Sequence, residues 1–257
     1  MGIVAAYLSG LADSRKASTI GRRAAAIGYH HKIAGHEPPT GSEAVKAVLR
    51  GIRRTIGAAR EGKAPATADV LKQMLVLCPD TLVGKRDRAL LALGFAGAFR
   101  RSELVALQVE DLAETPDGLR ARIRRSKTDQ EAQGAEVAIL RGCRLRPVEA
   151  VQSWLAAAGI STGALFRSVA KGGRVQEEAL SAFSAAQIVK HYAARAGLDP
   201  VLFAGHSLRA GFLTSAAEAG ASVFKMMEVS RHKSVDTLRG YVRRADLFHE
   251  HAGAAFL

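Results

Sequence analysis

Apolar residues recur at helical spacing along most of this chain, and this regularity limits its fold more than any other feature. Helices are predicted at residues 4–11, 19–34, 43–58, 67–77, 86–95, 148–158, 184–196, 207–219, 223–229 and 235–244. One region differs, because residues 119–125 alternate apolar residues with Arg, as a strand does, and residues 136–140 are suited to pair with them. The sequence therefore predicts a mainly α fold with a small antiparallel β-sheet.

A change of composition separates the first three helices from the rest. Residues 60–66 are rich in Arg, Gly, Lys, Ala and Pro, which is typical of a short exposed linker. We therefore expect two domains, a helical domain at 1–62 and a mixed α/β domain at 63–257. Within the first domain, residues 40–43 have the form of a capping box that opens the third helix.

The charge of the chain indicates its partner. Lys and Arg number 37 against 24 Asp and Glu, a formal net charge of +13, so a polyanion such as nucleic acid is the natural partner. The sequence has no apolar run long enough to span a bilayer and no signal-peptide pattern. Its two cysteines, Cys78 and Cys143, suggest neither a disulfide framework nor a metal site, and they fit a reducing cytoplasm.

Basic residues punctuate the first three predicted helices and have few acids near them. They form either a solvated face or a stripe that contacts phosphates, and the shortage of acids favours the stripe. In the second domain, Lys-Gly-Gly-Arg at 171–174 is typical of a turn that touches DNA. The residues expected to contact DNA are Arg22, Arg23, Lys32, Arg50, Arg53, Arg54, Arg101, Arg124, Arg125, Lys171, Arg174 and Lys233.

Three short motifs carry the residue types that a phosphoryl-transfer site needs. They are Gly-Ala-Phe-Arg-Arg-Ser-Glu-Leu at 97–104, His-Ser-Leu-Arg at 206–209, and Arg-His-Lys-Ser at 231–234, which leads to Tyr241. A transferring phosphoryl group needs cations in fixed positions and an attacking oxygen in line with the leaving one. The motifs offer guanidinium groups for the first task and a phenol for the second.

Spacing within the motifs is compatible with one site. Arg100 and Glu103 are one helical turn apart, as are His206 and Arg209, although surface pairs show the same spacing. Glu103 fits either an orienting group or a structural ion pair.

The third motif needs a break in its helix. His232 and Tyr241 are nine residues apart and would lie on opposite sides of one continuous helix. Ser234 is suited to cap a new helix between them, which would let both side chains face one pocket.

Taken together, the ordered motifs resemble those of the tyrosine recombinases of the phage integrase family, of the Cre-like and Xer-like kind, over nearly the whole sequence. Residues 97–104 resemble the first family box, and residues 206–209 and 231–241 resemble the second. Lys127, near the tip of the predicted hairpin, falls where the family keeps its catalytic lysine. The resemblance implies that the protein cuts and rejoins DNA strands through a covalent 3′-phosphotyrosyl intermediate, with no cofactor and no metal.

The resemblance also implies a role for each motif residue. Arg100 and Arg209 would hold the phosphate, and Tyr241 would attack it. The remaining groups would be Lys127 as the general acid, His206 as the second proton-transfer group and His232 as a hydrogen-bond donor to the phosphate. Two positions depart from the family pattern, since Arg231 stands where Gly is common and Ala210 stands where His is common.

At the level of domains, the resemblance makes 1–62 a SAM-like core-binding domain that is short at its start and 63–257 the catalytic domain. Together they would wrap double-stranded DNA that carries an inverted-repeat site, as a homodimer on one site and a homotetramer in synapsis. The apolar residues of 247–257 would cap their own core or pack into a neighbouring protomer.

Two other kinds of protein remain as alternatives. A DNA-binding accessory protein of the same fold would bind without turnover, and a type IB topoisomerase would relax supercoiled DNA without site preference. All the catalytic positions are filled here, which favours the recombinase.

Overall fold

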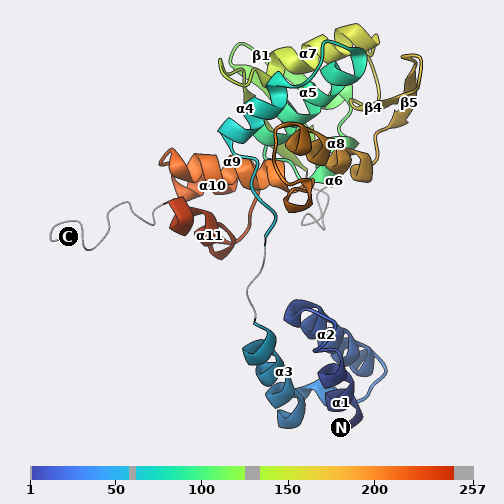
Figure 1. Ribbon diagram of the computed structural model, residues 1–257, viewed down its shortest axis with the longest axis vertical. Coiled ribbons are helices and arrows are strands. Elements are labelled where there is room, and N and C mark those ends of the chain that lie inside the picture. Colours follow the sequence, from blue (N-terminus) through green and yellow to red (C-terminus); the bar gives the residue numbers. More distant parts are fainter. Residues whose placement is uncertain (1, 58–61, 125–133, 246–257) are drawn as a thin grey trace, which may run out of the picture. The chain divides into compact units, whose positions relative to one another are not determined.

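A computed structural model describes residues 2–57, 62–124 and 134–245 of the 257-residue chain. The chain divides into two compact units, Met1–Gly62 and Lys63–Leu257, which are drawn in Figure 1. No helix in the described part of the chain is long and apolar enough to cross a membrane.

The first unit is a small group of helices. Its elements are α1 (Gly2–Gly10), α2 (Ala17–Ile33), the 3-10 helix η1 (Pro39–Gly41) and α3 (Glu43–Ile56). The helices pack around a small core that includes Leu8, Ile20 and Val45, all fully buried. Burial of such side chains is the main stabilising contribution available to a unit of this size.

The predicted capping box in this unit is wrong in its register. Ser42, and not Thr40, precedes α3, and its Oγ accepts a hydrogen bond from the Val45 amide at 3.4 Å. Thr40 lies inside η1, so its hydroxyl is not placed to cap α3. Glu43 is the first residue of the helix, and its Oε1 accepts from Lys46 Nζ at 3.0 Å.

The second unit combines helices with two small sheets. Its helices are α4 (Ala68–Val76), α5 (Leu82–Ala96), α6 (Arg101–Ala106), η2 (Val109–Asp111), α7 (Pro147–Ala158), α8 (Ala182–Arg195), η3 (Pro200–Leu202), α9 (Ser207–Glu218), α10 (Val223–Ser230) and α11 (Val235–Ala245). Its strands are β1 (Leu112–Thr115), β2 (Gly118–Ile123), β3 (Ala135–Leu140), β4 (Arg167–Val169) and β5 (Val175–Ala179).

The larger sheet has the strand order β1-β2-β3 with antiparallel pairing. Leu119 lies opposite Ile139 and Ala121 opposite Val137, and all four side chains are buried. The arginines between them point away from the core and are exposed. This alternation confirms the predicted pairing of the two strands, whereas β1 and the separate β4–β5 pair were not predicted.

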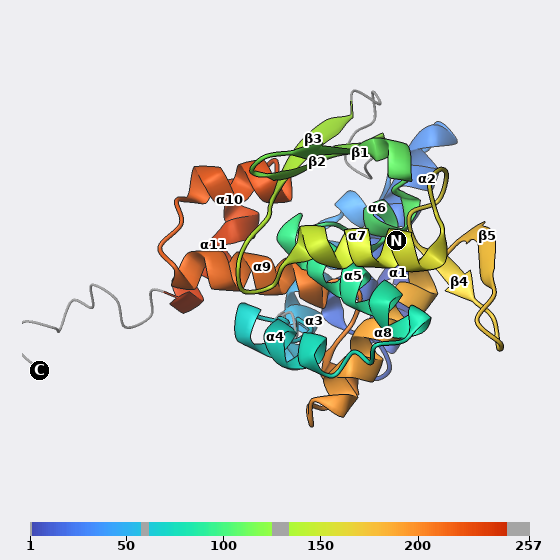
Figure 2. The same ribbon diagram turned by 90° about the horizontal axis from the view of Figure 1, so that it is seen from above.

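Helix α5 forms the centre of this unit, flanked by α7 and α9 (Figure 2). Gly94 allows this packing, because a Cβ there would lie 2.8 Å from Leu104 Cδ2 and 2.9 Å from Leu208 Cδ1. The helix begins four residues before the predicted start, since Thr81 caps it by accepting the Gly84 amide at 3.2 Å. Helix α5 therefore holds both motif-bearing helices, α6 and α9, close to its carboxyl-terminal half.

The prediction of an exposed linker at residues 60–66 is wrong for residues 64–66. The Ala64 amide donates to Leu202 O at 2.7 Å, and the Ala66 amide donates to Ser207 O at 2.9 Å. Ala66 is fully buried. Backbone donors at both positions thus find acceptors in the second unit, which makes residues 64–66 part of that unit.

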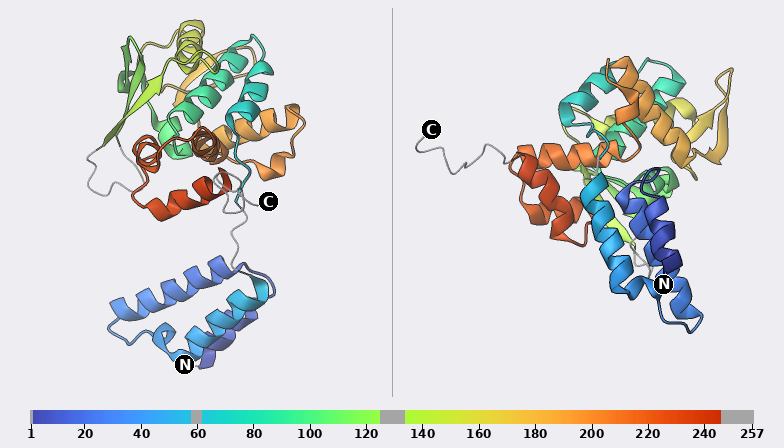
Figure 3. Two further views of the ribbon diagram at one scale, coloured as in Figure 1. Left: turned by 90° about the vertical axis from the view of Figure 1, so that its left-hand side faces the viewer. Right: turned by 60° about the horizontal axis from the view of Figure 1, so that its bottom comes forward.

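Helices α9, α10 and α11 pack as a group (Figure 3) around Leu213, Met226 and Leu238. Helix α10 ends at Ser230 and α11 begins at Val235. In the turn between them, Ser234 Oγ accepts the Asp236 amide at 3.2 Å. The predicted helix break at Ser234 is therefore confirmed.

Candidate active site

A buried carboxylate lies at the centre of the site. Arg100 immediately precedes α6, and Glu103 lies in the first turn of that helix. Glu103 Oε1 accepts from Arg100 Nη1 at 2.6 Å, and Oε2 accepts the Arg100 amide at 2.9 Å. The carboxylate side chain is 1% exposed. Glu103 therefore orients the Arg100 guanidinium and also caps the amino-terminal end of α6.

Arg209, in the first turn of α9, is completely buried. Its Nη1 donates to Ala98 O at 2.7 Å, and its Nη2 lies 3.1 Å from His232 Nε2. Burial, assisted by the positive charge of Arg100, lowers the pKa of Arg209 to about 10. The group is still a cation at neutral pH, so two guanidinium groups approach one region from different helices.

His232 lies in the turn between α10 and α11 and is held on two sides. Its Nδ1 is 2.8 Å from Ser230 Oγ, and Arg209 Nη2 lies 3.1 Å from Nε2 and 3.3 Å from Nδ1. Burial lowers the pKa of His232 to about 4, with further lowering by the nearby cations Arg209 and Arg100. The ring is therefore neutral at neutral pH in this state.

His206 immediately precedes α9 on the same side as Arg209. The residue is exposed, yet desolvation by the surrounding protein lowers its pKa, and the charges of Arg209 and Arg100 lower it further. A neutral imidazole has a lone pair that can accept a proton. The geometry thus places a potential base beside the two guanidinium groups.

Tyr241 lies in the second turn of α11 and packs against the core of the α9–α11 group. Its phenol is close enough to Arg209 for the phenolate charge to raise the pKa of that guanidinium. The structure therefore places the tyrosine on the same helix group as the buried arginine, within electrostatic range of it, in one chain.

Sequence reasoning did not name Ser230, and it named Arg231 without giving it a role in the site. Ser230 is fully buried, and its Oγ donates to Met226 O at 2.6 Å while facing His232. Arg231 Nη2 donates to Glu103 Oε2 at 2.8 Å. In the sequence, Arg231 stood out as the first residue of the third motif and as a departure from the resembled family, which commonly has Gly there.

The residues expected to contact DNA have varied surroundings. Those of the first unit, on α2 and α3, are exposed. Arg101 passes over Gly205, where a Cβ would lie 2.5 Å from Arg101 Cδ, and Arg124 Nε donates to the buried Asp111 at 2.7 Å. The other expected DNA-contacting residues that the structure describes are exposed. They are Lys171 and Arg174 in the turn between β4 and β5, and Lys233, which follows His232. Two predicted residues, Arg125 and Lys127, lie outside the described residues.

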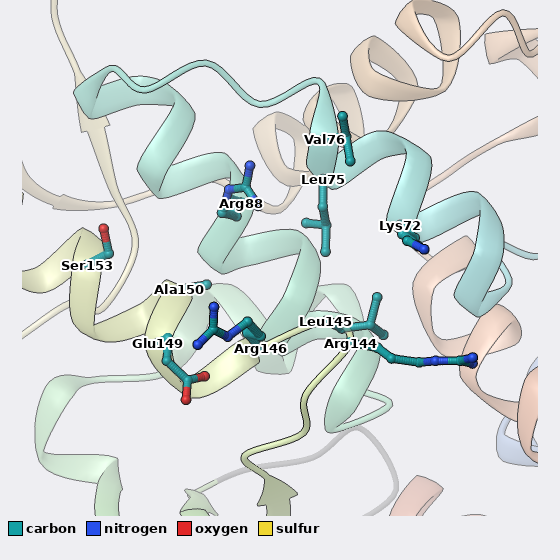
Figure 4. A pocket seen from close by; sticks show the side chains of 10 residues that line it. All are labelled: Lys72, Leu75, Val76, Arg88, Arg144, Leu145, Arg146, Glu149, Ala150 and Ser153. Atoms are coloured by element: carbon teal, nitrogen blue, oxygen red, sulfur yellow. The ribbon is translucent and has the colours of Figure 1, made fainter.

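A separate basic pocket of about 280 Å³ lies between α4, α5 and α7 (Figure 4). Its lining includes four cations and one carboxylate: Lys72, Arg88, Arg144, Arg146 and Glu149. None of the predicted site residues lines this pocket. The chemistry suggested by the motifs therefore belongs to the cluster around Glu103, and the basic pocket is not the candidate active site.

The fold and this cluster define a class of enzyme, the DNA recombinases that cut and rejoin strands. The chain belongs to the phage integrase family, whose model matches residues 66–247. This assignment confirms both the resemblance and the predicted fold class, a mainly α protein with small antiparallel sheets.

Individual relatives agree with the family assignment. The chain is 40% identical over 252 residues to an integrase/recombinase XerD homologue of Selenomonas ruminantium, covering 96% of this chain and 74% of the relative. It is 26% identical to recombinase Cre of Escherichia phage P1, covering 89% of this chain and 71% of Cre. These relatives identify the protein as a recombinase and DNA as its partner.

Solved structures show the same fold. The XerH site-specific recombinase, in a post-cleavage complex with a palindromic difH substrate, matches with a TM-score of 0.62 and 18% identity. The match covers 80% of this chain, which spans only 56% of the XerH chain.

Proposed function

We propose that this protein is a site-specific recombinase that cleaves DNA with Tyr241 and rejoins it without an external energy source. The observation that carries this proposal is the cluster in which Arg209 Nη2 lies 3.1 Å from His232 Nε2 and Glu103 holds Arg100 Nη1 at 2.6 Å, with the Tyr241 phenol within electrostatic range of Arg209. A phosphodiester repels an incoming oxygen, and fixed cations offset that repulsion most strongly in the five-coordinate transition state.

In the proposed reaction, Tyr241 Oη forms a bond to phosphorus and the bond from phosphorus to the 5′ oxygen breaks. The phenol proton passes to His206, directly or through water, and the departing 5′ oxygen takes a proton from Lys127. The products are a 3′-phosphotyrosyl enzyme and a free 5′ hydroxyl. Attack by the 5′ hydroxyl of another strand reverses these steps and completes the exchange.

Binding of the phosphate requires a local rearrangement. Arg209 has no exposed surface, and His232 lies against its Nη2. We infer that the phosphate takes the place of the His232 ring at that nitrogen, after which His232 donates to a phosphate oxygen. The Arg100 guanidinium, 18% exposed, is the more accessible of the two for the first contact.

For the assembly, we propose a homodimer on an inverted-repeat site and a homotetramer in synapsis. A palindromic substrate, like that of XerH, presents two equal half-sites, and one protomer on each is the simplest arrangement. Residues 1–62 would be the core-binding domain, and their exposed arginines would contact phosphates. The expected compartment is the cytoplasm, with the nucleoid.

The test is a nicked suicide substrate carrying a sequence selected from random DNA by binding to this protein. Wild-type protein should form a covalent adduct that survives denaturation, and Tyr241→Phe should form none. Tyr29→Phe is the matched control, because Tyr29 is an exposed tyrosine of the first unit and should leave the adduct unchanged. Binding without an adduct would support the accessory protein, and relaxation of plasmid without site preference would support the topoisomerase.

A further inference from the structure

We propose that Arg231 is a positioning residue that sets the placement of both Arg100 and Arg209, an inference that rests on the proposed function. Arg231 ends α10 in a left-handed conformation, with φ 58° and ψ 40°. An L residue rarely adopts this conformation, and a glycine would make the same turn without strain. The contacts of its side chain are what an arginine adds at this position.

The Arg231 guanidinium is enclosed by residues from both motif regions. Its Nη2 donates to Glu103 Oε2 at 2.8 Å, and its Nη1 donates to Gly97 O at 3.1 Å and Val229 O at 2.7 Å. The group also lies over the Phe99 ring, 5.4 Å from its centre, and the side chain is 11% exposed. Because both terminal nitrogens are engaged, Arg231 is not placed to bind the phosphate itself.

One link runs from Arg231 to Arg100 through a shared carboxylate. Glu103 accepts from Arg231 with Oε2 and from the Arg100 guanidinium with Oε1. A buried carboxylate held by two cations has little freedom to rotate, since rotation would break a charge-assisted bond. The position of the Arg100 fork therefore depends on Arg231.

A second link runs to Arg209 through a shared carbonyl. Ala98 O accepts from Arg209 Nη1 at 2.7 Å and from Arg231 Nη2 at 3.2 Å. Ala98 is itself left-handed, with φ 43°, so its carbonyl is presented by a strained turn. Arg231 helps to hold this turn and, with it, the acceptor that fixes Arg209.

These two links predict a defect in the chemical step and not in DNA binding. Loss of the Arg231 fork would let both phosphate-binding groups shift, and a misplacement of about 1 Å can lower a rate by about 100-fold. Affinity for DNA should change little, because it is spread over many phosphate contacts. A purely structural residue would instead lower the melting temperature, the affinity and the rate together.

The experiment measures single-turnover cleavage of the suicide substrate by Arg231→Gly, Arg231→Lys, Glu103→Gln and the double variant Glu103→Gln/Arg231→Gly. Each single variant should cleave roughly 10- to 100-fold more slowly, with a Kd for DNA within about twofold of wild type. The defect of the double variant should be smaller than the product of the two single defects, because both changes break the link through Glu103 and only Arg231→Gly also breaks the link through Ala98 O. Lys225→Ala is the control, since it removes an exposed cation, paired with Glu228 at 2.8 Å, from the same helix.

Two outcomes would overturn the inference. One is cleavage by Arg231→Gly or Arg231→Lys at the wild-type rate, and the other is multiplication of the two defects in the double variant. Arg231→Lys keeps the cation and the backbone, so it decides the matter if Arg231→Gly does not fold. Absence of an adduct with wild-type protein would instead contradict the proposed function.

Discussion

Ser230 Oγ and His232 Nδ1 lie 2.8 Å apart, and this contact determines which nitrogen of the His232 ring carries its proton. Ser230 uses its own hydrogen to donate to Met226 O at 2.6 Å, so it must accept from Nδ1–H. The neutral ring therefore keeps its lone pair on Nε2, the ring nitrogen nearer to Arg209 Nη2, at 3.1 Å against 3.3 Å for Nδ1. To donate from Nε2 to a phosphate, the ring must gain a proton.

We therefore predict that DNA binding takes up a proton at His232. The groups facing this ring are Arg209, Arg100, His206 and Arg231, which all disfavour its charged form, and the phosphate anion opposes them. Wild-type affinity for DNA should weaken as the pH rises from about 4, the pKa of His232 without DNA, through the higher pKa that the ring has beside the phosphate. Ser230→Ala should show a flatter profile, because its neutral ring is free to carry the proton on Nε2.

Fluorescence anisotropy with labelled DNA across this pH range measures the effect. Ser222→Ala is the control, since Ser222 caps the start of the same helix by accepting the Lys225 amide. An equal pH dependence in wild type and Ser230→Ala would contradict the role given to Ser230.

A second prediction concerns stability in acid without DNA. The pKa of His232 is about 4 in the folded protein and 6.5 without perturbation, so the unfolded chain binds this proton more readily. The stability that the neutral His232 ring contributes to the folded protein is fully present above pH 6.5 and is lost as the pH falls towards 4. Urea unfolding should therefore show a steeper loss of stability for wild type than for His232→Gln, and parallel losses would contradict the assigned pKa.

A third prediction concerns the contact between α9 and the start of the second unit. A Cβ on Gly211 would lie 1.8 Å from Ala66 O, a backbone atom that cannot turn away. Gly211→Ala should lower the free energy of unfolding by about 1–3 kcal/mol or more, as measured in urea.

Gly51→Ala is the matched change for this test. Gly51 lies in α3 with no atom near its missing Cβ, so alanine there should stabilise its helix by about 0.5–1 kcal/mol. Equal effects of the two substitutions would show that helix propensity, and not the Ala66 contact, decides the outcome at Gly211.

A fourth prediction concerns the exposed arginines of α3. If Arg53 and Arg54 contact phosphates, affinity for DNA should fall steeply with salt, and Arg53→Ala/Arg54→Ala should reduce the log–log slope by about two. Titrations at several salt concentrations measure this slope. Lys46→Ala is the control, because Lys46 is already paired with Glu43 on the same helix, and an equal reduction there would contradict specific phosphate contacts.

Local pattern predicted the longer elements and missed the short ones. The pairing of β2 and β3 followed from the alternation of buried and exposed residues. Strand β1, only four residues long, exists because it pairs with β2, and β4 and β5 pair only with each other. Helix α6 spans six residues and begins with the contacts between Arg100 and Glu103. Such elements depend on partners that a short window of sequence does not contain.

The candidate site likewise has features that the sequence predicted and features that it did not. Residue types and their order pointed to two arginines, two histidines and a tyrosine, and the helix break at Ser234 followed from its capping chemistry. Arg231 was visible as the first residue of the third motif and as a departure from a resembled pattern, but neither feature gave it a role. Nothing in the spacing indicated that this side chain would return to Glu103, 128 residues earlier.

The sequence by itself thus determined which of the longer helices form, where the chain breaks between α10 and α11, and which reactive groups the chain carries, because these depend on periodicity and capping over a few residues. Only the tertiary structure decided that Arg100 and Arg231 share the Glu103 carboxylate, that Arg209 is buried against His232, and that Ser230 orients that ring. The physical reason is that hydrogen bonds and ion pairs act over a few ångströms. Which charges meet is therefore decided by how α6, α9 and the turn after α10 pack together.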